Sequence, residues 1–200
     1  KFLLYALGGG LIMLFAVIGV YVVTARAGQP SFPISDVAGI SIGGTLEKYL
    51  FNGFFIAFAV KAPMVPVHSW LPDAAEQATP GATTLLVGVL DKIGTFGMIR
   101  FCLGLFPNAS AWATPLVVVL AVVSVIYGAL MAISSKNLLR LVAYTSVSHF
   151  GFMVLGIFAF TTASLTGSIF YMLAHGFSSA AMFLVVGFLS NRRGTAEIAA

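Results

Sequence analysis

Residues 58–74 read FAVKAPMVPVHSWLPDA, a stretch that places Lys61 just before two prolines inside an apolar run. The run extends over roughly residues 47–70, and about 20 mainly apolar residues suffice for a transmembrane helix. An interior proline removes a helical donor, so Pro63 and Pro66 predict a helix that opens near residues 59–62. A broken helix beside a charged residue is typical of membrane transporters. An ordinary proline kink is the alternative interpretation.

The composition around this stretch predicts an integral membrane protein. Hydrophobic residues make up 60% of the 200-residue chain and charged residues only 8%, whereas soluble domains carry about 25% charged residues. The ten Lys and Arg are scattered and the net charge is +4, so we expect no binding to nucleic acid. Cys102 is the single cysteine and lies in an apolar run, which predicts a buried thiol and neither a disulfide framework nor an iron–sulfur or other metal site.

Six apolar runs predict an all-α, polytopic membrane helix bundle that forms a single domain over 1–200. The candidate spans are about 2–23, 47–70, 83–106, 113–133, 138–160 and 166–190. The last three joints are short, so the helices on either side should be antiparallel neighbours. The first run could mimic a signal peptide, but its length and the runs that follow favour a transmembrane helix. Because the sequence starts at Lys1 without methionine and stops after a basic turn, we interpret it as a piece of a longer protein.

The distribution of basic residues gives a weak orientation. Basic residues near the ends of spans tend to lie on the cytoplasmic side, and the majority here falls at the chain's start, the 134–137 loop and the chain's end. We therefore place these segments and the 68–80 loop in the cytoplasm. The majority side holds Lys1, Lys136, Arg140, Arg192 and Arg193, and the other side holds Arg26, Lys48 and Arg100.

Four titratable side chains fall near the middle of four different spans. They are Lys61, Lys92, His149 and His175. An insertion cost of about 3 kcal/mol for a charge at the bilayer centre means that such residues usually mark a function. Lys61 and Lys92 are about ten residues from either end of their spans, roughly 15 Å at the helical rise, so they cannot simply extend to the interface. A single histidine could instead be a satisfied interhelical hydrogen bond.

The residue types favour proton transfer between helices at half depth. Burial disfavours the charged form of an amine, and histidine titrates near neutrality, so both groups can gain and lose protons. Thr95, Thr145 and Ser178 lie three or four residues from Lys92, His149 and His175, so each hydroxyl shares a helix face with a titratable group. These hydroxyls could hold water in a relay, or they could be ordinary packing residues.

Two further residues belong to the candidate site. Asp91 is the only carboxylate that we place deep in a span, so Lys61 either pairs with it or has a partner outside the sequence. His68 lies beside Trp70 at a span end, which predicts an interfacial position, although it could take up protons there.

Long, ordered motifs make nearly the whole chain resemble the antiporter-like membrane subunits of proton-pumping NADH:quinone oxidoreductase, respiratory complex I. Among these it is most similar to chain M, in a form like the actinobacterial ones. Related subunits of multi-component sodium/proton antiporters share much of the pattern. The motifs are residues 58–74, Lys92-Ile93-Gly94-Thr95-Phe96-Gly97, Arg100-Phe101, residues 141–151 (LVAYTSVSHFG) and Ala174-His175-Gly176.

The resemblance implies a fold and a set of roles. The family has fourteen helices with two inverted five-helix repeats, of which this piece resembles the sixth to eleventh helices. It implies that Lys61 is the broken-helix lysine, Lys92 the central lysine, and His149 and His175 the bridging histidines. The family's glutamate partner for the Lys61 position and its exit residue would lie outside this piece.

The chain departs from the family pattern at two positions. Ala75 stands where a histidine commonly follows Pro-Asp-Ala, which removes one candidate relay group on the cytoplasmic side. Asp91 replaces a usually apolar residue and would alter the charge balance at Lys92.

We therefore expect a proton-translocating subunit of a bacterial plasma-membrane NADH:quinone oxidoreductase, driven by quinone reduction elsewhere in the complex. Its partners would be the lipid bilayer and the other membrane subunits, while NADH, flavin, iron–sulfur clusters and quinone would belong to other chains of this respiratory electron-transport complex. The alternatives are a subunit of a cation/proton antiporter and a non-transporting membrane scaffold. A membrane enzyme acting on lipid is a more distant one.

Overall fold

The computed structural model describes residues 1–28, 30–31, 33–37 and 42–198, and every regular element in these ranges is helical. This confirms the predicted all-α class. In chain order the helices are α1 (Phe2–Arg26), α2 (Ile34–Val37), α3 (Gly44–Lys61), α4 (Trp70–Gln77), α5 (Pro80–Leu85), η1 (Leu86–Leu90), α6 (Lys92–Gly97), η2 (Met98–Leu103), α7 (Pro107–Ser134), α8 (Leu138–Ile157) and α9 (Thr162–Arg193).

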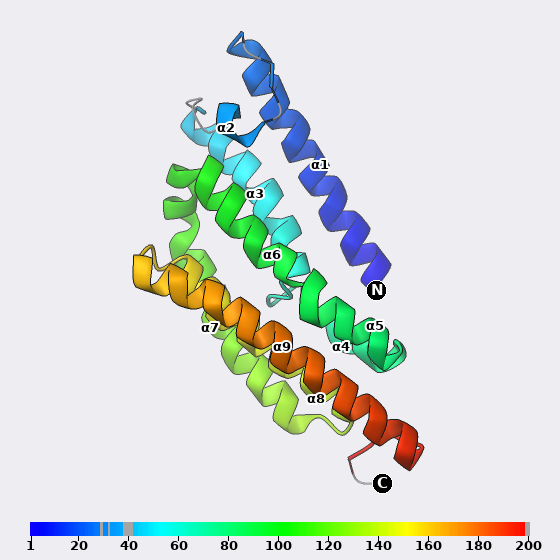
Figure 1. Ribbon diagram of the computed structural model, residues 1–200. Coiled ribbons are helices and arrows are strands. Elements are labelled where there is room, and N and C mark those ends of the chain that lie inside the picture. The colour runs from blue at the N-terminus through cyan, green and yellow to red at the C-terminus, as the bar shows by residue number, and fades with distance from the viewer. Residues whose placement is uncertain (29, 32, 38–41, 199–200) are drawn as a thin grey trace.

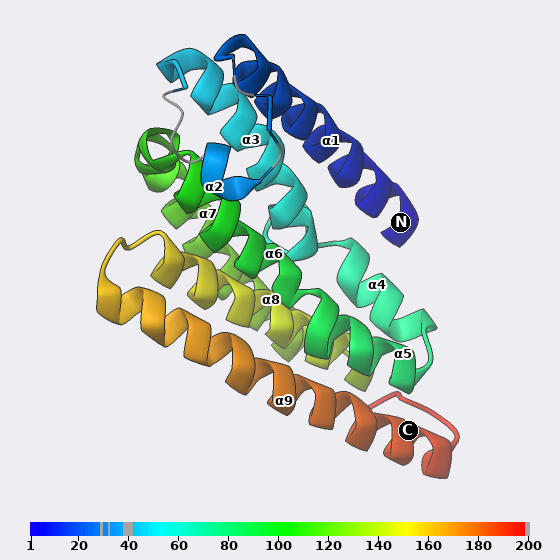
Figure 2. The same cartoon turned by 45° about the horizontal axis from the view of Figure 1, so that its top comes forward.

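The helices form two groups joined by a central helical segment. Figures 1 and 2 show α1 beside α3 at one edge and α7, α8 and α9 together at the other. The segment from α5 through η1 and α6 to η2 runs between them, and it contacts α3 on one side and α9 on the other. This central segment therefore connects the broken helix with the histidine-bearing helices.

Four helices in the described ranges, α1, α7, α8 and α9, are long and apolar enough to cross a membrane. Their outward faces carry large apolar side chains that water would not favour, such as Phe15, Ile133 and Phe177, each more than three-quarters exposed. The chain is accordingly a multi-pass membrane protein. The other two expected spans, 47–70 and 83–106, are not single regular helices.

The predicted opening of the second span lies between α3 and α4. Helix α3 ends at Lys61, two residues before Pro63, and α4 starts at Trp70. The indole Nε1 of Trp70 donates to the carbonyl of Val60 at 2.9 Å, and the backbone N–H of Val65 donates to Ser124 Oγ of α7 at 2.9 Å. Backbone groups that the prolines would leave unpaired thus find side-chain partners, which lets the break persist inside protein.

The third expected span contains two π-helical segments, η1 and η2, that the sequence pattern did not indicate. In η1 the N–H of Asp91 donates to the carbonyl of Leu86, five residues earlier, at 3.0 Å. Such wide turns insert one residue into the α-helical ladder and occur often at functional sites. The inserted residue rotates every side chain that follows, including Lys92.

A buried carboxylate at the N-terminal end of α3 caps α7, which the sequence pattern did not indicate. Glu47 is only 3% exposed, and its Oε1 accepts a hydrogen bond at 3.0 Å from the N–H of Ala109 in the first turn of α7. A helix N-terminus presents unpaired N–H groups and a partial positive charge, so a carboxylate there is stabilising.

Replacing Glu47 with alanine should therefore destabilise the packing of α3 on α7. We expect a loss of about 1–3 kcal/mol, because a buried N–H loses its acceptor. Heating detergent extracts and following the remaining assembled protein measures this as a lower midpoint. Glu47→Gln should fall between the wild type and alanine, and the exposed Glu197→Ala is the control. Equal midpoints for Glu47→Ala and the wild type would show that the cap contributes nothing.

Candidate functional site

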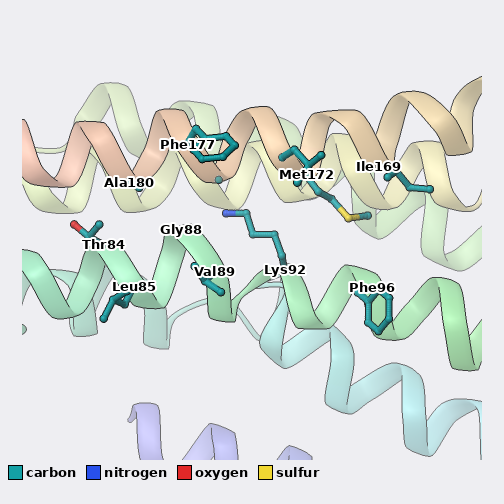
Figure 3. A pocket seen from close by; sticks show the side chains of 12 residues that line it. Thr84, Leu85, Gly88, Val89, Lys92, Phe96, Ile169, Met172, Phe177 and Ala180 are labelled. Atoms are coloured by element: carbon teal, nitrogen blue, oxygen red, sulfur yellow. The ribbon is translucent and has the colours of Figure 1, made fainter.

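Lys92 lies at the junction of the π-helical segment η1 and helix α6, and its side chain extends toward α9 (Figure 3). Its Nζ donates a hydrogen bond to the carbonyl of Val87, which belongs to the π-helical turn. The same nitrogen lies 5.3 Å from the centroid of the Phe150 ring of α8. The π-helical turn therefore supplies the acceptor that holds this amine inside the bundle.

A cavity of about 570 Å³ adjoins Lys92 between the central segment and α9. Among the described residues that line it, Lys92 carries the only charge. Beside the cavity the two backbones come close, because a Cβ on Gly176 would lie 2.9 Å from the carbonyl oxygen of Gly88. The glycines thus let the amine reach across from α6 to α9.

His149 of α8 and His175 of α9 face each other next to this amine. Their ring centroids are 5.1 Å apart, and His175 is 4% exposed. The Phe150 ring lies 5.4 Å from the His175 ring and also contacts Lys92. The structure therefore brings together three of the four titratable residues that the sequence singled out.

Lys61 lies apart from these three. Its Nζ is 5.9 Å from the centroid of the Phe2 ring of α1, and it lines a cavity of about 100 Å³ between α1, α3 and α6. Within the described ranges no hydrogen bond or ion pair joins Lys61 to Lys92. The two lysines face opposite sides of the central segment.

Asp91 is buried between these two sides, with 1% of its surface exposed. Its carboxylate interacts electrostatically with both Lys92 and Lys61. No ion pair within 4.0 Å involves it in the described part of the chain, and its Oδ2 has no hydrogen-bond partner there. Asp91 thus interacts with both lysines at more than ion-pair distance, and it is not the close ion-pair partner of Lys61 that the sequence left open.

The hydroxyls that were expected to support the relay bind backbone. Thr95 donates to the carbonyl of Lys92 at 3.0 Å, Thr145 to that of Val142 at 2.8 Å, and Ser178 to that of His175 at 3.3 Å. Each hydroxyl keeps its oxygen as an acceptor, but within the described residues none of the three is hydrogen-bonded to a titratable side chain.

The break also contains His68, for which an interfacial position was expected. The structure instead buries this residue to 7% exposure, with its ring 4.9 Å from that of Tyr127 on α7. Its Nδ1 has no hydrogen-bond partner within the described residues. The turns between Lys61 and Trp70 fold His68 inward, which apolar spacing along a continuous helix cannot indicate.

Sequence reasoning missed Tyr171, whose hydroxyl is hydrogen-bonded to His149 Nδ1. The signal was present, because Tyr171 lies four residues before His175 and so shares its helix face. It was not recognised because the partner, His149, is on another helix. Within the described ranges no three His, Cys, Asp or Glu side chains are placed to hold a metal ion.

An ion cluster joins three helices at one end of the bundle. Asp73 of α4 accepts from Lys1 at 2.6 Å and from Arg140 of α8 at 2.9 Å, and Arg140 also reaches Glu76 at 2.8 Å. The hydrogen bond from Lys1, together with Arg140, holds the pKa of Asp73 below its usual range. The chain's start, the 68–80 loop and the 134–140 region thus lie at the same end, as the expected orientation requires.

The whole chain is similar in sequence to a family of known membrane proteins. A family model described as NADH:quinone oxidoreductase/Mrp antiporter, TM matches residues 1–200. The chain is 54% identical over 205 residues to NADH-quinone oxidoreductase subunit M of Mycobacterium tuberculosis, covering 100% of this chain and 37% of that protein.

Two solved structures are similar in both fold and sequence. A chain of respiratory complex I from Thermus thermophilus with bound NADH matches with a TM-score of 0.91 and 35% identity over 98% of this chain. A chain of the Mrp complex from Dietzia matches with a TM-score of 0.84 and 28% identity over 96% of this chain. The chain spans 37%, 42% and 35% of the lengths of these three proteins, in the order given.

Proposed function

The chain belongs to the NADH:quinone oxidoreductase/Mrp antiporter transmembrane family, and we propose that it is part of a proton-translocating membrane subunit of an NADH:quinone oxidoreductase. The subunit would lie in a bacterial plasma membrane beside other membrane subunits of the complex. The nicotinamide, flavin, iron–sulfur and quinone chemistry would take place in those other subunits. The similarity to subunit M proteins over the whole chain supports this assignment.

The observation that carries the proposal is that Lys92 and His175 both lie against the Phe150 ring, while His149 faces His175. An amine and two imidazoles from three helices can each bind and release a proton. Because charging one group disfavours charge on its neighbours, a new charge on the Lys61 side pushes the proton on Lys92 onward.

In the proposed route a proton enters from the cytoplasmic side near Lys61. A proton passes from Lys61 to Lys92 and then, through water and hydroxyl groups, past His149 and His175 toward a group outside this chain. Quinone reduction elsewhere in the complex sets the first charge. The break after Lys61 supports the uptake step, because non-helical backbone at membrane depth accompanies water or buried protein.

A cation/proton antiporter subunit is the second candidate, and the similarity to a chain of an Mrp complex favours it. Sodium prefers oxygen ligands, however, and the titratable groups beside Phe150, Lys92 and His175, are nitrogen bases. We therefore expect proton translocation that does not require sodium.

Replacing both histidines with glutamine tests the proposal. We expect His149→Gln/His175→Gln to lower proton flux per assembled complex by about tenfold, because glutamine keeps hydrogen bonding but cannot take up a proton near neutral pH. The measurement is vesicle acidification during NADH oxidation, with and without sodium. Arg193→Gln, at the end of α9, is the control.

Undiminished pumping in the double variant would contradict the relay. Flux that disappears without sodium would instead favour the antiporter.

A further inference from the structure

Asp91 is a buried carboxylate without a local structural task. It lies in continuous helical backbone just before α6, where an aspartate side chain could still accept a hydrogen bond from the backbone of the next turn as a capping residue does. Here its side chain makes no such capping bond, and Oδ2 has no partner among the described residues. Burying an unpaired carboxylate is costly. The position therefore calls for an explanation other than helix stability.

The contacts of α6 place Asp91 between the two lysines. Gly94 faces the end of α3 so closely that a Cβ there would lie 2.4 Å from the N of Ala62, the residue after Lys61. Lys92 faces the other way, toward α9 (Figure 3). At about 100° per residue, Asp91 lies about 60° from Gly94 and about 100° from Lys92 around the helix, on the arc between them.

The electrostatic interactions of Asp91 agree with this placement. The carboxylate interacts with the charges of Lys61 on α3 and Lys92 on α6. Beyond Lys92 the next titratable groups are His149 of α8 and His175 of α9. Because Lys61 and Lys92 face opposite sides of the central segment, a proton that moves between them has to pass through the region that Asp91 occupies.

We propose that Asp91 is a proton-binding group of the relay, which receives a proton from Lys61 and delivers it to Lys92. In the first step an N–H bond of the Lys61 ammonium breaks and an O–H bond forms at Oδ2 of Asp91. In the second step that O–H bond breaks and an N–H bond forms on neutral Lys92, which restores the carboxylate. A water molecule or a rotation of the lysine side chain spans each gap, since neither lysine is within 4.0 Å of the carboxylate.

This inference rests on the proposed function and adds a third proton-binding group, between Lys61 and Lys92. The carboxylate suits the task because protonated lysines on both sides stabilise its charged form. Its neutral form is favoured when the lysines are not protonated. The group thus follows the charge of its neighbours and does not trap the proton.

The test uses the whole complex in membranes carrying Asp91→Asn, Asp91→Glu or Lys92→Ala. We expect Asp91→Asn to lower proton flux per assembled complex by about tenfold, and Asp91→Glu to keep most of it. Infrared difference spectra during turnover should show a protonated carboxylic acid band that Asp91→Asn removes and Asp91→Glu shifts. Asp36→Asn, which changes an exposed carboxylate in the same way, should leave flux and spectrum unchanged.

Wild-type flux in Asp91→Asn, or a spectrum without a band that this variant removes, would overturn the inference. If Asp91→Asn does not assemble, the glutamate variant decides, because an unshifted band assigns the signal to another group. The Lys92→Ala variant separates the two proposals. If Lys92→Ala loses proton flux while Asp91→Asn keeps normal flux, only the role of Asp91 is contradicted. Normal flux in Lys92→Ala defeats the relay itself.

Discussion

Replacing Lys92 with alanine is expected to abolish proton translocation while the complex still assembles. Lys92 links two groups of residues that otherwise do not meet, because Lys61 faces α1 and the histidines lie on α8 and α9. Removing a group that takes and gives a proton typically costs about a hundredfold or more in rate. Alanine introduces no clash, since the amine borders a cavity of about 570 Å³.

The measurement is the number of protons moved per NADH oxidised in vesicles, with the amount of assembled complex determined on native gels. Lys136→Ala, which removes an exposed lysine from the loop between α7 and α8, should match the wild type. The scaffold alternative expects the reverse pattern, with less complex but an unchanged proton ratio. A wild-type ratio in Lys92→Ala would end the relay interpretation.

Replacing Gly94 with alanine should prevent correct packing of the central segment. A Cβ at this position would lie 2.4 Å from the N of Ala62 and 2.7 Å from the carbonyl oxygen of Phe58. Both are backbone atoms at the end of α3, so no side-chain rotation can relieve the overlap. Overpacking costs typically about 1–3 kcal/mol and more where the backbone has to shift. We therefore expect little or no assembled complex.

Gly104→Ala is the matched control for this substitution. Its Cβ would find only the carbonyl oxygen of Ile99, at 3.9 Å, which is an ordinary contact. Native gels of membranes should show normal assembly for Gly104→Ala and loss for Gly94→Ala. Full assembly of the Gly94 variant would mean that α6 can move away from the break, and that the close packing of α6 on the end of α3 does not fix the spacing between Lys61 and Asp91.

The sequence predicted the class and much of the broken helix because these depend on local chemistry. A hydrophobic share of 60% with 8% charged residues leaves a membrane as the only suitable solvent. Pro63 and Pro66 remove backbone donors wherever they stand, so α3 ends at Lys61 as the prolines indicated. Residue type alone also selected Lys92, His149 and His175 as groups worth locating.

Only the tertiary structure decided which of these groups meet. The π-helical segment η1 inserts a residue into the ladder, and close packing at Gly94 and Gly176 fixes how the central segment is rotated. That rotation turns Lys92 toward α9, leaves Lys61 facing α1 and buries Asp91 between them. A one-residue insertion turns a helix face by about 100°. Nearly every face of a membrane helix is apolar, so the pattern of apolar residues along the sequence does not indicate how the helix is rotated.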